Sequence, residues 1–408
     1  MNNIIVMKFG GSSVATPEKI KIVAARVAKK SKSYKVVVVV SAPGDMTDDL
    51  ITKATRITLL PDPREMDMLL ATGEMQSIAL LSMAIRSMGK DSISLTGPQA
   101  GIHADNVHTK AKIRKIMPQK IIKELQKGKV VIVAGFQGLN SNDDITTLGR
   151  GGSDLTAVAL ASALKAVECE IYTDVKGVYT ADPRLVKDVK KLDLISYDEM
   201  LELAGVGSQV MMARSIEVAK KFNVIIHVRS SFSQEKGTLI TREVPLMEDV
   251  VVSGIAYDKN EAKLSITDVP DKPGIAAKIF GALANANINV DMIIQSAARE
   301  RYNDISFTVP KSELKNAVSI LKKVSCNIGA GRIIYKEDVA KVSIVGIGMK
   351  SHPGVAAKMF AILANKKINI EMISTSEIKI SCVVSEKDTQ KAVNLLHKEF
   401  GLNKSNTR

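Results

Sequence analysis

The chain has 408 residues, of which 45% are hydrophobic, 25% charged and 4% aromatic. This length is too great for one ordinary hydrophobic core, so a multidomain soluble protein is expected. The net charge of +14 suits either nucleic acid or small anionic substrates, but the lysines are scattered along amphipathic stretches such as 113–129 and aromatic residues for base stacking are scarce, which disfavours a nucleic-acid-binding protein.

Strand-like and helix-like segments alternate through the first half of the chain. Strands are predicted over residues 4–9, 35–41, 129–134, 168–173 and 224–228, and helices over 17–30, from 66 onward, over 154–164 and over 197–204. This alternation is typical of an α/β domain with a largely parallel sheet. The pattern continues to about Thr241, and a polar, proline-containing segment at 242–248 reads as a linker. We therefore predict a first domain over residues 1–245.

The C-terminal part contains an internal repeat. Residues 273–293 and 353–373 match without a gap. In each copy a strand ends in a Pro-Gly turn, a helix with apolar residues at helical spacing follows, and Ile-Asn-Val or Ile-Asn-Ile opens the next strand. The repeat predicts two small α+β modules, which we assign to residues 246–336 and 337–408.

Membrane, disulfide and metal-binding functions are not indicated. The apolar run Val36–Val40 is far shorter than the roughly 18 residues that a membrane span needs, and the N-terminus leads into a strand without a signal peptide, so a cytoplasmic location is expected. The three cysteines form no C-x-x-C motif. His103 and His108 are close in sequence but lack a third ligand nearby, which favours a polar loop over a metal site.

The first motif with chemical content is Lys8-Phe-Gly-Gly-Ser-Ser13, between the first strand and the first helix. Glycines let the backbone approach a ligand, serines add donors, and the lysine supplies a positive charge, so this segment can bind phosphate. A turn that only caps the helix is the alternative. The chain contains neither G-x-x-x-x-G-K-[ST] nor G-x-G-x-x-G, so a nucleotide site has to be of another kind.

Two further polar motifs follow. In Leu148-Gly-Arg-Gly-Gly-Ser-Asp154, Arg150 can bind a carboxylate with two hydrogen bonds and Asp154 can orient an amine or a metal-bound phosphate. The alternative is a flexible glycine loop with a capping Ser or Asp. The segment 172–184 is rich in hydroxyl groups and suits ribose and phosphate contacts, although a surface β-turn hairpin explains it equally well.

Taken in order, these motifs resemble the aspartate kinases over nearly the whole chain. The segments that carry the resemblance are Lys8-Phe-Gly-Gly-Ser-Ser13, Val40-Ser-Ala-Pro-Gly-Asp-Met-Thr-Asp48, Ala71-Thr-Gly-Glu74, Leu148-Gly-Arg-Gly-Gly-Ser-Asp154, Tyr172-Thr-Asp174 and Val178-Tyr-Thr-Ala-Asp-Pro-Arg184. The resemblance implies the amino acid kinase fold, an open, mainly parallel sheet between helices, followed by two ferredoxin-like ACT modules. It also implies transfer of the γ-phosphate of ATP to the β-carboxylate of L-aspartate, the first step towards lysine, threonine and methionine.

The resemblance assigns roles to individual residues. The implied catalytic pair is Lys8 and Asp154, which we expect in polar loops. The implied L-aspartate contacts are Asp45, Thr47, Glu74, Arg150, Gly151, Gly152 and Ser153. The implied ATP contacts are Lys8, Gly10, Gly11, Ser12, Ser41, Thr173, Asp174, Tyr179, Arg184 and Gln209. Gln209 stands where many relatives carry a lysine, which either weakens ATP binding or is offset by another lysine. Mg²⁺ is expected with ATP, held mainly by the phosphates.

The repeated modules are the implied site of control. Their Pro-Gly turns can offer backbone amides to a carboxylate at a helix N-terminus, or can simply cap the two helices. The implied effector contacts are Asp271, Gly274, Ala276, Asn289 and Gln295 in the first module and Val355, Asn369, Ile370, Ser376 and Glu377 in the second. By resemblance the effectors are lysine and/or threonine, and the chain forms a homo-oligomer through its ACT modules. Met247 is a candidate start for a separate regulatory subunit, or equally a linker residue.

Two other functions are compatible with parts of the sequence. Another enzyme of the same fold, such as a glutamate 5-kinase or a uridylate kinase, shares the glycine loops, but Glu74 and the paired C-terminal modules argue against it. A non-catalytic amino acid sensor is the other alternative. The intact set of Lys8, Arg150 and Asp154 disfavours that interpretation.

Overall fold

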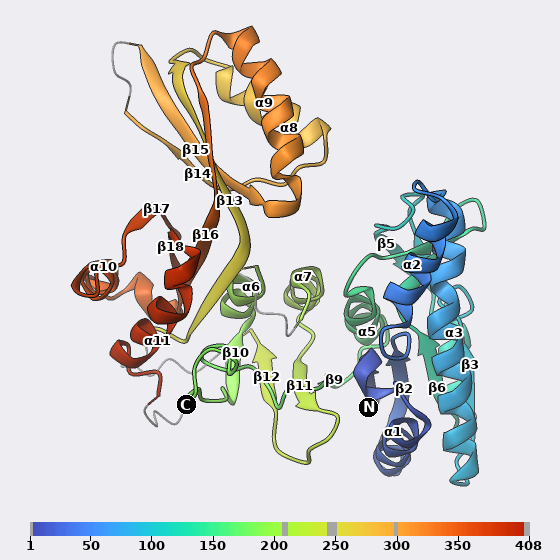
Figure 1. The fold of residues 1–408 in the computed structure, drawn as a ribbon. Helices are drawn as coiled ribbons and strands as arrows, with labels where there is room; N and C mark the ends of the chain where they lie inside the picture. Colours follow the sequence, from blue (N-terminus) through green and yellow to red (C-terminus); the bar gives the residue numbers. More distant parts are fainter. Residues whose placement is uncertain (1–2, 206–210, 243–250, 298–300, 404–408) are drawn as a thin grey trace.

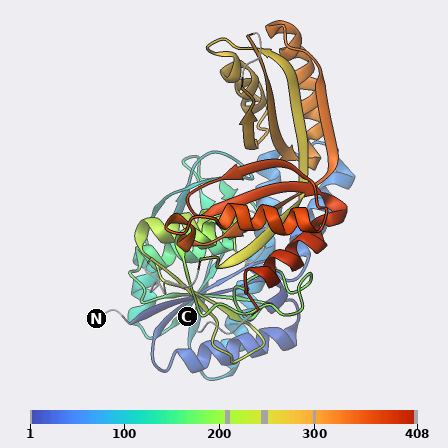
Figure 2. The ribbon, with the colours of Figure 1, turned by 90° about the vertical axis from the view of Figure 1, so that its left-hand side faces the viewer.

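The computed structural model describes residues 3–205, 211–242, 251–297 and 301–403. An α/β domain comes first along the chain, and a C-terminal region of two smaller modules follows it (Figure 1). One of these modules lies against the α/β domain, whereas the other projects away from it (Figure 2).

The α/β domain is built on an eight-stranded sheet with the order β10-β12-β11-β9-β1-β2-β6-β3. Its strands are β1 (Ile4–Phe9), β2 (Lys35–Val40), β3 (Ser92–Leu95), β6 (Val130–Ala134), β9 (Cys169–Thr173), β10 (Leu194–Ser196), β11 (Ile226–Ser230) and β12 (Thr238–Thr241). All neighbouring strands are parallel except β11 and β12. The predicted α/β domain with a mainly parallel sheet is confirmed, and β1, β2, β6 and β9 end at the same edge.

Helices cover both faces of this sheet (Figure 1). One face carries α1 (Pro17–Lys30) and α3 (Pro63–Ser87), and the other carries α4 (Gln119–Gln126), α5 (Gly152–Ala163), α6 (Tyr197–Gly205) and α7 (Ala213–Phe222). In β1 the side chains alternate between the faces, so Ile5 and Met7 pack on the α1 side and Ile4 and Val6 on the α5 side. Residue 8 has the parity of Val6, and Lys8 therefore projects toward α5.

Some elements of the first domain were not predicted. They are the strands β3, β10 and β12 and the helix α7 given above, together with α2 (Met46–Ile57) and a four-stranded sheet formed by β4 (Ile102–Ala104), β5 (Ile113–Ile116), β7 (Gln137–Leu139) and β8 (Ile145–Thr147). The strands of this sheet are only three or four residues long, which is too short to show a regular alternation of apolar and polar residues. The stretch 113–129 is a strand followed by a helix, because Pro118 interrupts it.

Helix α3 is long and apolar enough to cross a membrane if only length and composition are considered. In the fold it is a core helix. Leu81 and Ile85 are fully buried against the sheet, and two charged residues of the same helix, Asp67 and Glu74, are also buried. A core helix of this kind passes the same compositional test.

The C-terminal region forms one six-stranded antiparallel sheet with the order β14-β15-β13-β16-β18-β17. The strands are β13 (Gly254–Pro270), β14 (Asp291–Gln295), β15 (Tyr302–Pro310), β16 (Ile333–Val345), β17 (Ile370–Thr375) and β18 (Lys379–Ser385), and the helices are α8 (Ile275–Asn285), α9 (Leu314–Ile328), α10 (Val355–Asn365) and α11 (Thr389–Glu399). In each copy of the repeat the helix starts directly after the Pro-Gly turn, as the sequence predicts.

The two modules share their longest strands. Leu264 and Ile266 of β13 pack with α8 and α9 of the first module, whereas Val252 and Ile255 pack with α10 and α11 of the second. The start of β13 therefore belongs to the core of the second module although it precedes the first module in sequence. The predicted boundary between residues 336 and 337 remains a prediction. It divides the modules by their order in the sequence, whereas their cores interleave.

Candidate active site

The predicted catalytic pair is a buried ion pair. Lys8 Nζ lies 2.7 Å from Asp154 Oδ1, and the two side chains are only 11% and 10% exposed. Lys8 belongs to β1 and Asp154 to the first turn of α5. The expectation that both residues lie in polar loops is therefore wrong, because the alternation of β1 turns Lys8 inward onto the helix. The pair sits at the sheet edge where the glycine-rich loops begin.

The loops after β1 and β2 contact each other through their backbones. Gly44 N donates to Gly11 O at 3.0 Å, and a Cβ on Gly11 would lie only 2.7 Å from Ala42 O, so no larger residue fits there. Gly10 lies beside the Lys8 ammonium group, and Ser41 directly follows β2. The structure thus gathers Lys8, Gly10, Gly11 and Ser41 at one edge. Ser12 is exposed on the same loop.

The N-terminus of α5 faces the same edge. Gly152, Ser153 and Asp154 form its first turn and are buried. A Cβ on Gly135, the residue after β6, would lie 2.6 Å from Ser153 Oγ, so the end of β6 and the start of α5 are in close contact. Unpaired amides and the helix dipole make such a terminus favourable for an anion.

Arg150 reaches the start of α2. Its side chain is 89% exposed, and Nη2 lies 3.5 Å from Asp48 Oδ1. Asp45 precedes α2 and Thr47 is in its first turn. Two of the loops predicted to bind aspartate therefore meet at this ion pair. A ligand carboxylate can replace Asp48 as the partner of Arg150.

Glu74 is placed differently, inside the fold on α3. It is 3% exposed, and its Oε1 accepts a hydrogen bond from Ala42 N at 3.0 Å. Burial raises the pKa of Glu74 to about 7, although the hydrogen bond from Ala42 opposes this shift. Among the described residues, the buried Oε2 has no hydrogen-bond partner. A carboxylate with one unpaired oxygen beside the loop after β2 suits a ligand ammonium group.

Sequence reasoning missed a second buried carboxylate on α3. Asp67 is fully buried. Its carboxylate accepts hydrogen bonds from Thr147 Oγ1 at 2.5 Å and from Thr109 N at 3.1 Å, and it pairs with His108 Nδ1 at 2.7 Å. These bonds fix the end of β8 and thereby the loop that carries Arg150. His108 lies in a loop, as predicted, and contacts this carboxylate, whereas His103 belongs to strand β4, so the predicted polar loop is wrong for His103. A lone aspartate within a helical pattern gives no sequence signal for such a role.

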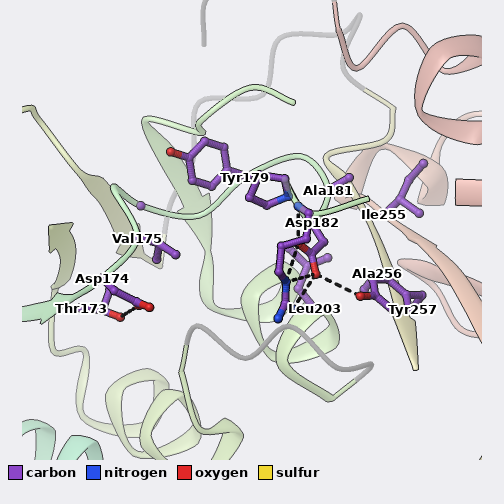
Figure 3. Close-up of a pocket in the computed structure, with 13 residues that line it drawn as sticks. Thr173, Asp174, Val175, Tyr179, Ala181, Asp182, Leu203, Ile255, Ala256 and Tyr257 are labelled. Atoms are coloured by element: carbon purple, nitrogen blue, oxygen red, sulfur yellow. Dashed lines mark hydrogen bonds and ion pairs between the residues drawn. The ribbon is translucent and has the colours of Figure 1, made fainter. Parts of the chain in front are cut away.

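Four of the residues predicted to bind ATP line a pocket of about 330 Å³ beyond the end of β9 (Figure 3). These are Thr173, Asp174, Tyr179 and Arg184. Thr173 Oγ1 donates to Asp174 Oδ1 at 2.9 Å, and Arg184 is paired with Asp182 at 2.7 Å. Gly10 N donates to Tyr172 O at 3.3 Å, which connects the Lys8 loop to the strand that leads into this pocket. Gln209 lies outside the described residues.

The pocket has a wall that was not predicted. Ile255, Ala256 and Tyr257 of β13 line it, together with residues of the α/β domain. Their contribution depends on the docking of the second module and leaves no local pattern in the sequence.

The candidate effector residues lie at corresponding places in the two modules. Gly274 and Gly354 immediately precede α8 and α10, whose first residues include Ala276 and Val355. Asn289 and Asn369 precede β14 and β17, and these edge strands contact each other through Met292 and Met372. The remaining positions are Asp271, which accepts from Asn303 Nδ2 at 3.4 Å, Gln295 at the end of β14, Ile370 at the start of β17, Ser376 just after it, and Glu377, whose carboxylate lies 2.5 Å from Lys350 Nζ.

Comparison with known proteins agrees with this arrangement. The model of the amino acid kinase family matches residues 3–230, and that of the ACT domain matches 267–324 and 342–400. An aspartokinase from Pseudomonas aeruginosa is 52% identical over 402 residues, which are 98% of each chain.

Two crystal structures of aspartokinase III from E. coli also match, each at 25% identity. The complex with aspartate and ADP in the R-state has a TM-score of 0.82 and covers 97% of this chain and 99% of that one. The complex with lysine and aspartate in the T-state has a TM-score of 0.77 and covers 98% of this chain and 100% of that one. The family models, the sequence identity along nearly the whole chain and the shared fold show that this chain belongs to the amino acid kinase family. Within that family it belongs to the aspartate kinases with two ACT domains.

Proposed function

We propose that this enzyme transfers the γ-phosphate of ATP to the β-carboxylate of L-aspartate and forms 4-phospho-L-aspartate in the cytoplasm. The observation that carries the proposal is the buried pair of Lys8 and Asp154, at the sheet edge between the glycine loop, the N-terminus of α5 and the loop of Arg150. The aspartate and ADP named in the E. coli complex support the same pair of ligands.

The chemistry of the reaction explains why this site is built from cations and amides. The β-carboxylate is ionised at neutral pH, so attack on phosphorus needs no general base. The barrier comes from bringing two anions together and from the charge on the transferring phosphoryl group. Lys8 supplies positive charge at that group, and Asp154 holds the lysine in place. The amides at the start of α5 add fixed dipoles.

Mg²⁺ is proposed to enter with ATP and to neutralise phosphate charge. The residues near Lys8 fit a metal held mainly by phosphates, because Asp154 is already paired with the lysine. Within the described ranges, the group with metal-ligand geometry is Glu168, Glu170 and His227. Lys30 and Arg229 already pair with Glu170, each at 3.0 Å, so we assign no protein metal site to that group.

The acceptor is the sharpest test of this function. Purified enzyme with Mg-ATP should release ADP when L-aspartate is added, but not with L-glutamate or without an amino acid. Hydroxylamine should trap the product as a hydroxamate, because an acyl phosphate is an activated carboxyl group. ADP release with glutamate or a uridine nucleotide alone would favour one of the other enzymes of this fold, and no release with any acceptor would favour a sensor.

The ACT modules are proposed to bind lysine, threonine or both and to inhibit the kinase from a distance. Lysine has the stronger support, because it is named in the T-state complex of the E. coli enzyme. A free amino acid carboxylate fits the turns at Gly274 and Gly354. We further propose that the modules pair two chains. A regulatory subunit that starts at Met247 is a proposal on a residue outside the described part of the chain.

Inhibition should behave as a coupling between separate sites. Allosteric couplings are typically about 1 to 3 kcal/mol, so lysine or threonine should weaken substrate binding by roughly five- to 150-fold at saturation. The Gln295→Ala variant should require more effector for half-inhibition at unchanged basal activity. Gln119→Ala, an exposed glutamine on α4, is the matched control. Wild-type activity that ignores both amino acids, with no binding by calorimetry, would remove the regulatory assignment and leave the kinase assignment intact.

A further inference from the structure

One wall of the nucleotide pocket is formed by a strand of the regulatory region. Ile255, Ala256 and Tyr257, at the start of β13, form part of its lining (Figure 3). Ile255 N donates to Thr180 O at 2.8 Å, which attaches β13 to the loop between Tyr179 and Arg184. A pocket within the catalytic domain alone would lack this wall.

The same loop is held from a second side by α11. Thr180 Oγ1 and His397 Nε2 form a buried hydrogen bond of 2.9 Å, and Asn394 Nδ2 donates to Leu185 O at 3.0 Å. Ala181 and Val186 are buried in the core of the second module. The conformation of the nucleotide loop therefore depends on contacts with the second ACT module along most of its length.

One chain of polar contacts crosses from β13 into the pocket. The Tyr257 hydroxyl donates to Asp182 Oδ2 at 3.1 Å (Figure 3). Asp182 in turn accepts from Arg184 Nε at 3.1 Å and from Arg184 Nη2 at 2.7 Å. The Asp182 side chain is 17% exposed, whereas that of Arg184 is 70% exposed.

The charge on Asp182 is secured by these donors. Burial alone would raise the pKa of Asp182, but the hydrogen bonds from Arg184 and Tyr257 outweigh it and lower the pKa. The carboxylate therefore stays ionised at neutral pH and continues to hold Arg184. Arg184 uses Nε and Nη2 for this pair, and within the described ranges its Nη1 has no hydrogen-bond partner.

We propose that Tyr257 is a positioning residue of the nucleotide site, which acts through Asp182 to hold Arg184 with Nη1 directed at bound ATP. The inference rests on the proposed binding of ATP in this pocket. An exposed arginine loses side-chain entropy when a ligand immobilises it, and a side chain that is already held loses less. In this way Tyr257, a residue of the ACT region, contributes to the affinity for ATP although it does not contact the reacting atoms.

The test is Tyr257→Phe, which removes the hydroxyl and keeps the ring. Loss of one hydrogen bond of this kind should raise the KM for ATP roughly two- to tenfold, with the KM for aspartate and kcat close to wild type. Calorimetric titration with ADP, without aspartate, should show the same loss and is independent of turnover. Tyr335→Phe, an exposed tyrosine on β16, is the matched control and should leave all of these values unchanged.

A double-variant cycle tests the path through Asp182. Asp182→Asn should also weaken ATP and ADP binding selectively, and adding Tyr257→Phe to it should cause no further loss. The proposal would be overturned if the fold-changes of the two single variants multiplied in the double variant. It would also be overturned if the affinities for ATP and for aspartate fell equally. Normal ADP binding by Tyr257→Phe would overturn it as well. If that variant failed to fold, Asp182→Asn alone would decide by the same selectivity. A wild-type enzyme without aspartate-dependent ADP release would instead contradict the proposed function.

Discussion

Replacing Lys8 with alanine should lower kcat for aspartate phosphorylation on the order of a hundredfold or more. The reason is positional, because the ammonium group lies at the meeting point of the β1 loop and the α5 N-terminus, where the transferring phosphoryl group is proposed to lie. Asp154→Asn should reduce kcat by a similar order, because Lys8 loses the partner that holds it. Steady-state assays of ADP release at saturating substrates measure both.

Folding must be measured in the same samples, because the pair is buried. Removing one member leaves the other charge without its partner, which typically costs about 3 to 5 kcal/mol. The free energy of unfolding of Lys8→Ala should fall by an amount of that order, and the Lys8→Met/Asp154→Asn double variant should recover part of it but none of the activity. A double variant that regains both would show that the pair is structural.

The control for this experiment is Lys21→Ala, an exposed lysine on α1. It should keep both kcat and stability. Near-normal turnover of a folded Lys8→Ala or Asp154→Asn enzyme would remove the catalytic role of that residue.

The part of the fold that the sequence predicts well has strong local signals. The strand at Ile4–Phe9 and the helix at Pro17–Lys30 have the predicted bounds, since an uninterrupted apolar run marks the strand, and Thr16 caps a helix with Pro17 at its first position. The repeat likewise marks both modules. The small sheet escapes prediction because its strands are only three or four residues long, too short to show a regular alternation. Helix α2 is amphipathic, and its apolar residues Met46, Leu50 and Ile51 pack in one cluster, so its signal was present in the sequence and was overlooked.

The site divides along the same physical line. Glycine loops that can bind anions are local features, so Lys8, Gly11, Arg150 and Asp154 stand out in the sequence. Asp67 and Tyr257 act only through contacts between distant segments, Asp67 with the loop after β4 and with β8, and Tyr257 with the nucleotide loop. Nothing near them in sequence indicates those contacts. The sequence also does not indicate that the cores of the two ACT modules interleave. A repeat shows that two segments are similar, but not that the start of β13 packs in the second module.

Glu74 should make both the stability of the free enzyme and its affinity for aspartate depend on pH. Burial raises the pKa of Glu74 from its ordinary value of 4.5 to about 7. Between pH 4.5 and about pH 7 the unfolded chain has lost the Glu74 proton that the folded chain still holds, so the free energy of unfolding falls as the pH rises. This loss of stability is absent below pH 4.5 and complete above about pH 7, where it amounts to about 3 kcal/mol. Near pH 8 the Glu74→Gln variant should therefore be more stable than the wild type by up to that amount, and below pH 4.5 the two proteins should be equally stable.

Aspartate binding should change in the opposite direction. The ligand ammonium group gives the unpaired Oε2 a charged donor, and only the ionised carboxylate can use it fully. The Kd for aspartate, measured by calorimetry without ATP, should decrease as the pH rises from about 6 to about 8, around the raised pKa. Glu74→Gln should bind aspartate on the order of tenfold to a hundredfold more weakly at the upper pH, and its Kd should no longer change over this range.

Two controls separate this role from general damage to the site. Glu65→Gln changes an exposed glutamate on the same helix and should alter neither stability nor the Kd. Arg150→Ala should weaken aspartate binding through the loss of a carboxylate contact, but it should keep the dependence on pH because Glu74 is intact. If wild-type binding of aspartate were flat between the two pH values, or if Glu74→Gln bound aspartate normally, Glu74 would have to be taken out of the aspartate site. The buried carboxylate would then serve only to hold the loop after β2 through Ala42.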